Sequence, residues 1–324
     1  MKTRFVALSM LVAVSAPFCN PLFSQGYPSK PVRLVLPSPP GGGTDITARI
    51  VARALADGLG GQVVVDNRGG ASGRIGVELV AKSPPDGYVL LLGGVTPLAT
   101  IPAAVSNLGY DPVRDFVPIS MVAISDYLLV AHPSLQATTV KELIALARSR
   151  PGQINFASVG NLSGAHVAGE LLKQLAKIDV VHVPYNGGAP AVRAVLTGET
   201  SFYFSSGPTS MPYVQAGRLR AIAGAGAKRS RAYPNLPTIA ETLPGFEATQ
   251  WYGVLAPAGT PGDIISRLHA VIVKEMNTPG VVQQITATGA DPIVSSSSQE
   301  FSAFMKAEIA KWSKVAKARG ISLE

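Results

Sequence analysis

The sequence contains a single cysteine, Cys19, among 324 residues, so no disulfide can form within the chain. Charged residues make up only 15% of the chain, and 28 Lys and Arg against 20 Asp and Glu give a net charge of +8. A chain this poor in charge is neither disordered nor a coiled coil. The basic residues are scattered and lack an aromatic stripe, so they argue only weakly for nucleic-acid binding. With 47% hydrophobic residues, the chain can bury a core in one or two domains.

The first 26 residues have the pattern of a secretory signal peptide. A short basic start precedes an apolar run over residues 5–16. These 12 residues are too few to span a bilayer, which needs roughly 20 residues, but they match the apolar region of a signal. We therefore expect a signal peptide over residues 1–26, cleaved between Ser24 and Gly26, and an exported mature protein.

Signatures of catalysis and of metal binding are missing as well. The four histidines show no HExxH or other ligand spacing, and the Gly-x-Ser-x-Gly elbow of hydrolases is absent. Asp45, Ser163 and His166 could be drawn as a triad, but nothing in the sequence supports that geometry. We therefore expect a protein that is not an enzyme, with no catalytic residue, no metal and no cofactor. The alternative is an exported hydrolase with its active site in a cleft between two lobes of the protein.

Short apolar segments alternate with segments of helical spacing along most of the chain. Residues 32–36 form a β-branched run, and Ile46, Ile50 and Leu55 then recur at helical spacing. Continuous apolar strands between helices indicate α/β units with a mostly parallel sheet flanked by helices. The same rhythm resumes after Asp126, and no repeat of fixed period is present. Two units followed by further helices suggest two lobes, although periodicity leaves open where the chain crosses between them.

The expected strands and helices follow from the same patterns. We expect strands over 32–36, 62–66, 88–92, 127–131, 155–157, 180–183, 201–204, 219–223 and 249–256. We expect helices over 44–59, 72–81, 140–149, 163–175, 189–196, 209–216, 263–276 and 299–319.

The first loop between a strand and a helix, residues 37–45, is rich in proline and glycine. Its three glycines permit backbone conformations closed to other residues, and its free N–H groups converge with the positive end of the helix dipole. Such a loop binds an anion, or it is an ordinary turn, and the sequence leaves both open. No Gly-Lys-Ser/Thr follows, and the glycines are not spaced as GxGxxG. A carboxylate therefore fits this loop better than a nucleotide.

Three more polar, glycine-rich loops follow predicted strands. In the loop over residues 158–164, Ser163 either contacts a ligand or caps the helix, and the nearby His166 is at least as readily structural. Tyr185 follows a later strand, and the loop over 204–207 follows another. Ligands of open α/β sheets collect at the carboxyl ends of strands. Four such loops together therefore indicate a binding site better than any single one.

Eight short segments stand in a specific order along the chain. They read YPSKP from residue 27, PPGGGTD from 39, DNRGGASG from 66, PDGY from 85, VPY from 183, PT from 237 with Glu241, WYG from 251 and APAGTP from 256. Within them, Arg68 either pairs with a ligand carboxylate or braces its loop. Taken together, these segments resemble the Bug-type extracytoplasmic solute receptors of tripartite tricarboxylate transporters, over essentially the whole mature chain.

The resemblance implies a two-lobed, type II periplasmic-binding-protein fold that closes around a small ligand. It implies one lobe over residues 27–124 plus 225–324 and a second lobe over 125–224. It also implies a periplasmic monomer that captures a small organic acid and delivers it to the membrane components of a tripartite tricarboxylate transporter. No nucleic acid and no cofactor are expected.

The family typically holds a ligand carboxylate with backbone N–H groups and ordered waters. Relatives often carry an acid where this chain has Ser205 and Ser206, so we expect amino-acid ligands to be less favoured here. The resemblance and the loops together nominate the following ligand-binding residues: Pro40, Gly41, Gly42, Gly43, Thr44, Asp45, Gly160, Asn161, Ser163, His166, Tyr185, Ser205 and Ser206.

Overall fold

The structure of the protein, a computed structural model, describes residues 26–319 except Gly42 and Ser106. The predicted signal peptide, apart from Gly26, lies outside the described residues. Within the part that is described, no helix combines the length and the apolar character that crossing a membrane requires.

The first lobe is built on a sheet whose outer strands are parallel. Strand β1 lies between β2 and β3, with Leu34 opposite Val65 on one side and Leu90 on the other. Successive side chains of a strand point to opposite faces, so Leu34 and Val35 enter two different cores. The strands are β1 (Val32–Leu36), β2 (Val63–Asn67), β3 (Val89–Gly94), β9 (Thr249–Pro257), β10 (Asp291–Pro292) and the first part of β4 (Phe116–Ala131).

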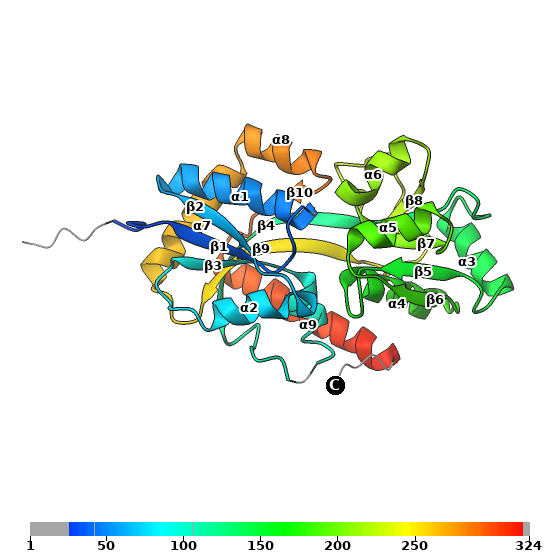
Figure 1. The fold of residues 1–324 in the computed structure, drawn as a ribbon, viewed down its shortest axis with the longest axis horizontal. Helices are drawn as coiled ribbons and strands as arrows, with labels where there is room; N and C mark the ends of the chain where they lie inside the picture. The colour runs from blue at the N-terminus through cyan, green and yellow to red at the C-terminus, as the bar shows by residue number, and fades with distance from the viewer. Residues whose placement is uncertain (1–25, 42, 106, 320–324) are drawn as a thin grey trace, which may run out of the picture.

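Helices cover both faces of this sheet, which explains why its strands are apolar along their whole length. Helices α1 and α8 lie over one face in Figure 1, with α7 packed against α1, while α2 and α9 lie under the other. The helices are α1 (Gly43–Leu59), α2 (Arg74–Ala81), α7 (Gly262–Met276), α8 (Pro279–Ala287) and α9 (Ser298–Arg319). Three short helices lie in connecting segments of the chain: η1 (Ala71–Gly73), η2 (Thr96–Thr100) and η3 (Ile239–Glu241).

The second lobe repeats this arrangement with fewer strands. Strand β5 lies between β6 and β7 and is parallel to both, and helices α4 and α5 pack on the sheet. Its elements are β5 (Asn155–Ser158), β6 (Val181–Pro184), β7 (Phe202–Ser206), β8 (Arg220–Gly224), α3 (Val140–Ser149), α4 (Gly164–Ala176), α5 (Gly188–Leu196) and α6 (Gly207–Gln215).

Strand β4 connects the two lobes because it changes its partners along its length. Asp126 is opposite Thr249 of β9 in the first lobe, whereas the next residue, Tyr127, is opposite Ser206 of β7 in the second. The protein is therefore two-lobed, as predicted (Figure 1). We propose the division 27–124 plus 225–324 and 125–224, which this change of partners supports.

Both sheets contain parallel and antiparallel pairs. The antiparallel pairs are formed by β4, which leaves the first lobe, and by strands that run back along it. Strand β9 is antiparallel to both β3 and β4, so β4 leaves the first lobe in the direction of β1. In the second lobe β4 is antiparallel to β7, so β5, β6 and β7 run back toward the first lobe. The prediction of mostly parallel sheets thus describes the outer strands, while β4 and β9 pair antiparallel. As a result, the carboxyl ends of the parallel strands of both lobes face each other.

Three elements differ from the sequence-based expectation. The strand expected over 127–131 is the end of the 16-residue strand β4. Pro118 and two register shifts interrupt its first part, so that segment shows neither a continuous apolar run nor a clean alternation. Helix α8 and the two-residue strand β10 had no distinct signal in the sequence.

Candidate ligand-binding crevice

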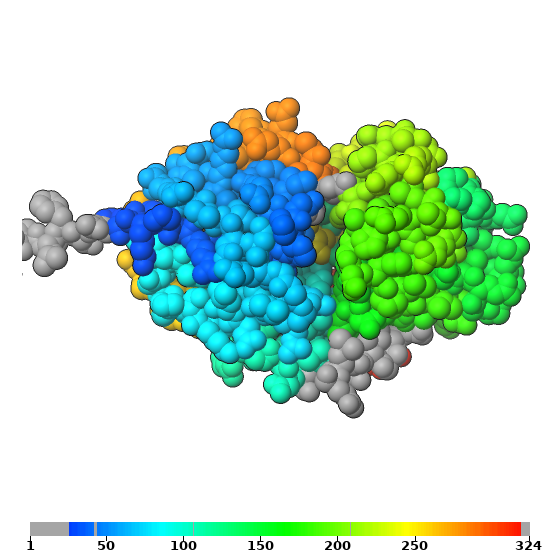
Figure 2. All heavy atoms as spheres, viewed as in Figure 1, coloured from blue at the N-terminus to red at the C-terminus, as the bar shows by residue number. Residues whose placement is uncertain are grey.

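A crevice separates the two lobes and is visible in Figure 2 between the blue and the green parts of the surface. Because the parallel strands of each lobe end at this side, the loops that follow β1 and β2 face the loops that follow β5, β6 and β7. Two other surface hollows lie elsewhere: one beside α7, around His269 and Glu300, and one along the edge formed by β1 and β2. The crevice, rather than either hollow, brings the nominated loops together.

Asp45 organises the first loop from within. Its carboxylate is buried and accepts hydrogen bonds from the Gly41 N–H at 3.0 Å and the Asn67 side-chain amide at 3.0 Å, and it pairs with Arg49 at 3.1 Å. Burial by itself would raise the pKa of Asp45, but these three donors outweigh it and hold the pKa below its usual value. Asp45 therefore stays charged and keeps the loop in shape; its oxygens are already engaged with these donors.

The other residues nominated in this loop lie around Asp45. Pro40 and Gly41 are exposed, and Gly41 has a left-handed φ of 85° that favours glycine. Helix α1 begins at Gly43, and a side-chain hydrogen bond links Thr44 to Tyr252 on β9. Gly42 lies outside the described residues.

The segment after β2 supports the first loop from one side. Asn67 donates to the Ser38 carbonyl at 3.2 Å as well as to Asp45. A Cβ on Gly76 would lie 2.9 Å from the Pro37 Cα, so glycine is required where the two segments meet. Arg68 pairs with Asp66 at 3.0 Å. Arg68 was expected either to pair with a ligand carboxylate or to brace its own loop, and this contact supports the second role.

The second loop, residues 158–164, is held by internal hydrogen bonds. Ser163 caps α4, because its side chain accepts the His166 N–H at 3.2 Å. The Gly160 N–H donates to the Ser158 hydroxyl at 3.1 Å, and the Leu162 N–H donates to the His166 ring at 3.0 Å. Most of the amides predicted to grip a ligand here are thus already engaged. Asn161, at the tip of the loop, is exposed.

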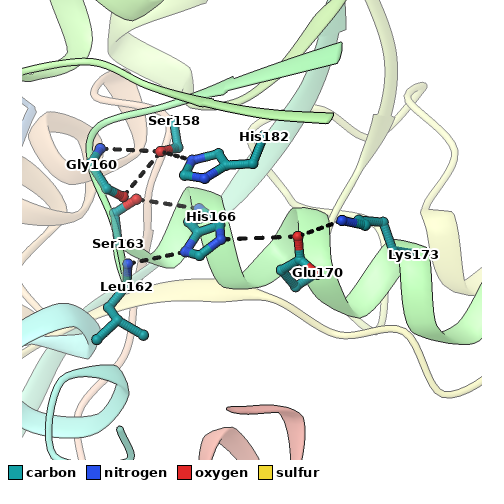
Figure 3. Close-up of polar contacts among 8 residues, drawn as sticks. All are labelled: Ser158, Gly160, Leu162, Ser163, His166, Glu170, Lys173 and His182. Carbon is teal, nitrogen blue, oxygen red and sulfur yellow. Dashed lines mark hydrogen bonds and ion pairs between the residues drawn. The ribbon is translucent and has the colours of Figure 1, made fainter. Parts of the chain in front are cut away.

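Two stacked imidazole rings lie beside this loop (Figure 3). The centroids of His166 and His182 are 3.9 Å apart, and His182 Nε2 lies 2.6 Å from the Ser158 hydroxyl. Burial lowers the pKa of His166, and burial together with the charge of His166 lowers the pKa of His182 to about 4. His166 Nε2 lies 4.0 Å from Glu170, which pairs with Lys173 at 2.9 Å. The pair is therefore neutral at pH 7, and His166 is a buried structural group.

The loops after β6 and β7 offer backbone rather than side chains. The Tyr185 hydroxyl donates to Glu199 at 2.7 Å, and burial and then this bond raise the pKa of Tyr185 to about 12. The buried Ser205 donates to the backbone of Ser206, whose own hydroxyl lies 2.8 Å from that of Thr209. Neither α5 nor α6 has a side-chain cap, so the first amides of both helices carry no such partner.

Three hydrogen bonds that were not predicted link residues of the first lobe to residues of the second. The Thr100 hydroxyl donates to the Leu162 carbonyl at 2.6 Å, and the Gly164 N–H donates to the Thr96 hydroxyl at 3.3 Å. The Tyr127 hydroxyl donates to the Gln250 side chain at 2.7 Å. These residues lie in or near apolar segments that predict strands and buried helix, so the sequence alone gives no sign that they meet.

Asp45, Ser163 and His166 do not form a catalytic triad in the structure. Asp45 belongs to the first lobe and is bound by its own loop, whereas the Ser163 hydroxyl accepts a backbone N–H rather than contacting an imidazole. Among the described residues, no group of three or more His, Cys, Asp or Glu side chains is placed to hold a metal ion.

Two lobes with strand-end loops facing a shared crevice define the class of two-lobed solute-binding proteins. A family model described as "Tripartite tricarboxylate transporter family receptor" matches residues 47–321. The chain is also 36% identical to Protein BugT of Bordetella pertussis over 324 residues, which covers 99% of each chain. The chain therefore belongs to the tripartite tricarboxylate transporter receptor family.

Solved structures agree with this assignment. "R. palustris Rpa4515 with adipate" has a TM-score of 0.84 and 37% identity, covering 91% of this chain and 99% of that one. "MatC (Rpa3494) from Rhodopseudomonas palustris with bound malate" has a TM-score of 0.79 and 28% identity, covering 89% and 99%. The family and the periplasmic-binding-protein fold predicted from the sequence are confirmed.

Proposed function

We propose that this receptor captures a small dicarboxylate in the crevice, closes its lobes around it and presents it to the membrane components of a tripartite transporter. The observation that carries the proposal is the facing of the strand-end loops across the crevice in a chain of this family. Relatives with adipate and with malate bound support a ligand that carries two carboxylates. Function in the periplasm, as a monomer, belongs to the same proposal.

The first loop supplies the main anchor for one carboxylate. The first turn of a helix leaves backbone N–H groups free, and the helix dipole favours an anion there. The Gly41 N–H donates to Asp45, which fixes the loop, and is therefore not available to the ligand carboxylate. The amides that bind the carboxylate are those at the start of α1, at Gly43 and Thr44. Amides bind a carboxylate without placing a full positive charge beside it, which suits reversible capture and release.

The second lobe supplies the opposing contacts once the crevice closes. Asn161 offers an exposed side-chain amide at the tip of its loop, and the uncapped starts of α5 and α6 offer backbone N–H groups beside Tyr185 and Ser206. Gly160, Ser163, His166 and Ser205 stay within the proposed site as groups that shape these loops. Closure excludes water and strengthens each hydrogen bond to the carboxylates.

The test is calorimetric titration of the exported protein with adipate, malate, aspartate and glutamate, followed by recovery of the ligand. We expect a dicarboxylate to bind and to be recovered unchanged, and the two amino acids to bind more weakly because Ser205 and Ser206 replace an acid. Conversion of the ligand would favour the hydrolase alternative. Absence of binding across the dicarboxylates would contradict the proposal.

A matched pair of glycine variants locates the ligand. Gly41 and Gly259 have the same backbone strain, with φ of 85° and 87°, and neither would bring a new Cβ closer than 3.8 Å to the atoms around it. Gly41→Ala should weaken dicarboxylate binding, whereas Gly259→Ala, at the far end of β9, should not. Equal affinities in the two variants would show that binding does not depend on the backbone conformation of the first loop at Gly41, contrary to the anchor proposed above.

A further inference from the structure

Leu162 is held in a conformation that leucine rarely adopts. Its φ of 58° lies in the left-handed region, where the Cβ of an L-residue crowds the following carbonyl oxygen. Both of its backbone groups are engaged by side chains. Its N–H donates to His166 Nδ1 at 3.0 Å, and its carbonyl accepts the Thr100 hydroxyl at 2.6 Å. These two bonds compensate for the strain and fix the direction in which the loop presents Asn161.

The bond from Leu162 also defines the tautomer of His166. Because Nδ1 accepts the Leu162 N–H, it carries no proton, and the proton of the neutral ring is on Nε2, toward Glu170 (Figure 3). A proton added to Nδ1 would point at the Leu162 N–H and replace an attraction by a repulsion. The loop therefore depends on a neutral His166.

We propose that His166 is a positioning residue: it holds the second loop in its ligand-binding shape through Leu162, and protonation of its Nδ1 releases that loop and weakens ligand binding. The proposal rests on the function proposed above, because it assigns the loop to the ligand site.

The surroundings of the ring set the direction of this response. His182 from β6 stacks on His166 at 3.9 Å, so a charge on one ring opposes a charge on the other. Glu170 on α4 favours protonation of His166, and Lys173 opposes it. On α9, which also packs on α4, Glu308 and Lys311 pair with each other. Burial lowers the pKa of both rings, so release requires acid below the ordinary range of histidine.

His182 completes the same support from the side of β6. Its Nε2 lies 2.6 Å from the Ser158 hydroxyl, which accepts the Gly160 N–H and donates to the Gly160 carbonyl. The two stacked rings thus hold the loop at two points, Gly160 and Leu162, on either side of Asn161. A substitution or protonation of His166 should therefore change the position of Asn161 at the tip of the loop.

The decisive variant is His166→Asn, compared with His166→Leu. The Oδ1 of an asparagine can take the place of Nδ1 as an acceptor but does not titrate between pH 4.5 and 7.5, whereas leucine offers no acceptor. With adipate as the probe at pH 7.5, His166→Asn should bind within about threefold of the unmodified protein, and His166→Leu at least about tenfold more weakly, which corresponds to 1.4 kcal/mol. His132→Asn, at a half-buried histidine of the same lobe whose ring contacts the Ser134 hydroxyl, is the control.

The pH profile separates positioning from simple packing. Between pH 7.5 and 4.5, adipate affinity of the unmodified protein and of His132→Asn should fall more steeply than that of His166→Asn. The comparison at each pH cancels the protonation of adipate itself, and circular dichroism confirms that each variant is folded. Equal pH slopes for the unmodified protein and His166→Asn would overturn the proposal, as would full affinity in His166→Leu.

A second readout needs no ligand. Nitrogen NMR of the histidine rings at pH 7.5 should show Nδ1 of His166 without a proton and Nε2 with one. Acid should lower the protection of the Leu162 amide, measured as its exchange rate relative to the intrinsic rate at the same pH, in the unmodified protein but not in His166→Asn. A proton on Nδ1, or exchange that ignores the substitution, would refute the positioning role. If no dicarboxylate binds at any pH while these signals behave as expected, the function proposed above fails and the role of His166 in shaping the loop stands.

Discussion

The Gly226 N–H donates to the carboxylate of Asp126, and the two residues lie on the two different segments that pass between the lobes. Asp126 is the last residue of β4 paired with β9 before β4 turns to β7. Gly226 follows β8, just after Ala225, whose N–H donates to the Tyr127 carbonyl at 2.8 Å. A single carboxyl group thus joins the two segments by which the chain passes between the lobes.

Asp126 should make stability depend on pH in an unusual direction. Burial, followed by the charges of Asp291 and Glu247, raises the pKa of Asp126 to about 7 in the folded protein, against about 3.9 in an unfolded chain. Between these values the folded state binds more protons, so its contribution to stability is present at low pH and is lost as the pH rises toward 7. Between pH 4 and 8, ionisation of Asp126 should lower the free energy of unfolding of the unmodified protein by on the order of 2–4 kcal/mol. Asp126→Asn should not show this decrease.

Urea unfolding at pH 4, 6 and 8 measures this contribution. The informative quantity is the difference between Asp126→Asn and the unmodified protein at each pH, which should grow in favour of the variant as the pH rises. Asp57→Asn, on the exposed side of α1, removes a charge elsewhere and serves as the control. A difference that does not change with pH would show that Asp126 is ionised throughout the range.

Gly226 should tolerate no side chain while Asp126 is present. A Cβ at this position would lie 2.3 Å and 2.6 Å from the two carboxylate oxygens of Asp126. Gly226→Ala should therefore destabilise the protein by about 1–3 kcal/mol. Asp126→Ala in the same background removes the clashing atoms and should recover part of that loss.

A double-mutant cycle by urea unfolding gives the coupling between the two positions. A coupling energy near zero would mean that the stability of the fold does not depend on their close approach.

Removing the Asp45 carboxylate should disorganise the first loop. Asp45→Ala removes the acceptor of the Gly41 N–H and one of the two acceptors of the Asn67 amide, and the loss of hydrogen bonds to a charged group should cost about 1.5–3 kcal/mol of stability. Adipate affinity should fall as well, since the loop that presents the start of α1 is no longer fixed. Denaturant unfolding and calorimetry on the same samples measure the two effects.

Arg49→Ala is the contrasting variant, because Arg49 is the exposed partner of the same carboxylate. Exposed ion pairs contribute about 0–1 kcal/mol, so its stability should stay close to that of the unmodified protein. Equal losses in both variants would mean that the ion pair, rather than the bonds from Gly41 and Asn67, organises the loop.

Thr100→Val should weaken the contact between η2 and the second loop. The substitution keeps the shape of the side chain but removes the hydroxyl that donates to the Leu162 carbonyl, at a cost of about 1 kcal/mol. Thr96→Val, which removes the longer 3.3 Å contact with the Gly164 N–H, should cost less. Thermal unfolding of the two variants ranks them, and the reverse order would contradict the assignment of Thr100 as the stronger link.

The local elements were largely predictable from the sequence. The apolar run from Val32 to Leu36 and the helical spacing after Thr44 predict β1 and α1 because strand and helix periods are visible within a few residues. Ser163 was weighed as a helix cap, and the structure shows that cap. The first part of β4 escaped prediction because its pairing with β9, with two register shifts, is formed with a segment more than a hundred residues away.

The sequence by itself determined the family, most of the strands and helices in their order, and the loops that follow the strands, because these depend on local spacing and on short segments. Only the tertiary structure decided which atoms of those loops are free. In the structure, Asp45, Ser163 and His166 form hydrogen bonds within their own loops. The structure also places Thr100 in contact with Leu162, and Asp126 in contact with Gly226. The physical reason is that a hydrogen bond between distant segments is set by how the lobes pack, and no pattern along the chain encodes that distance.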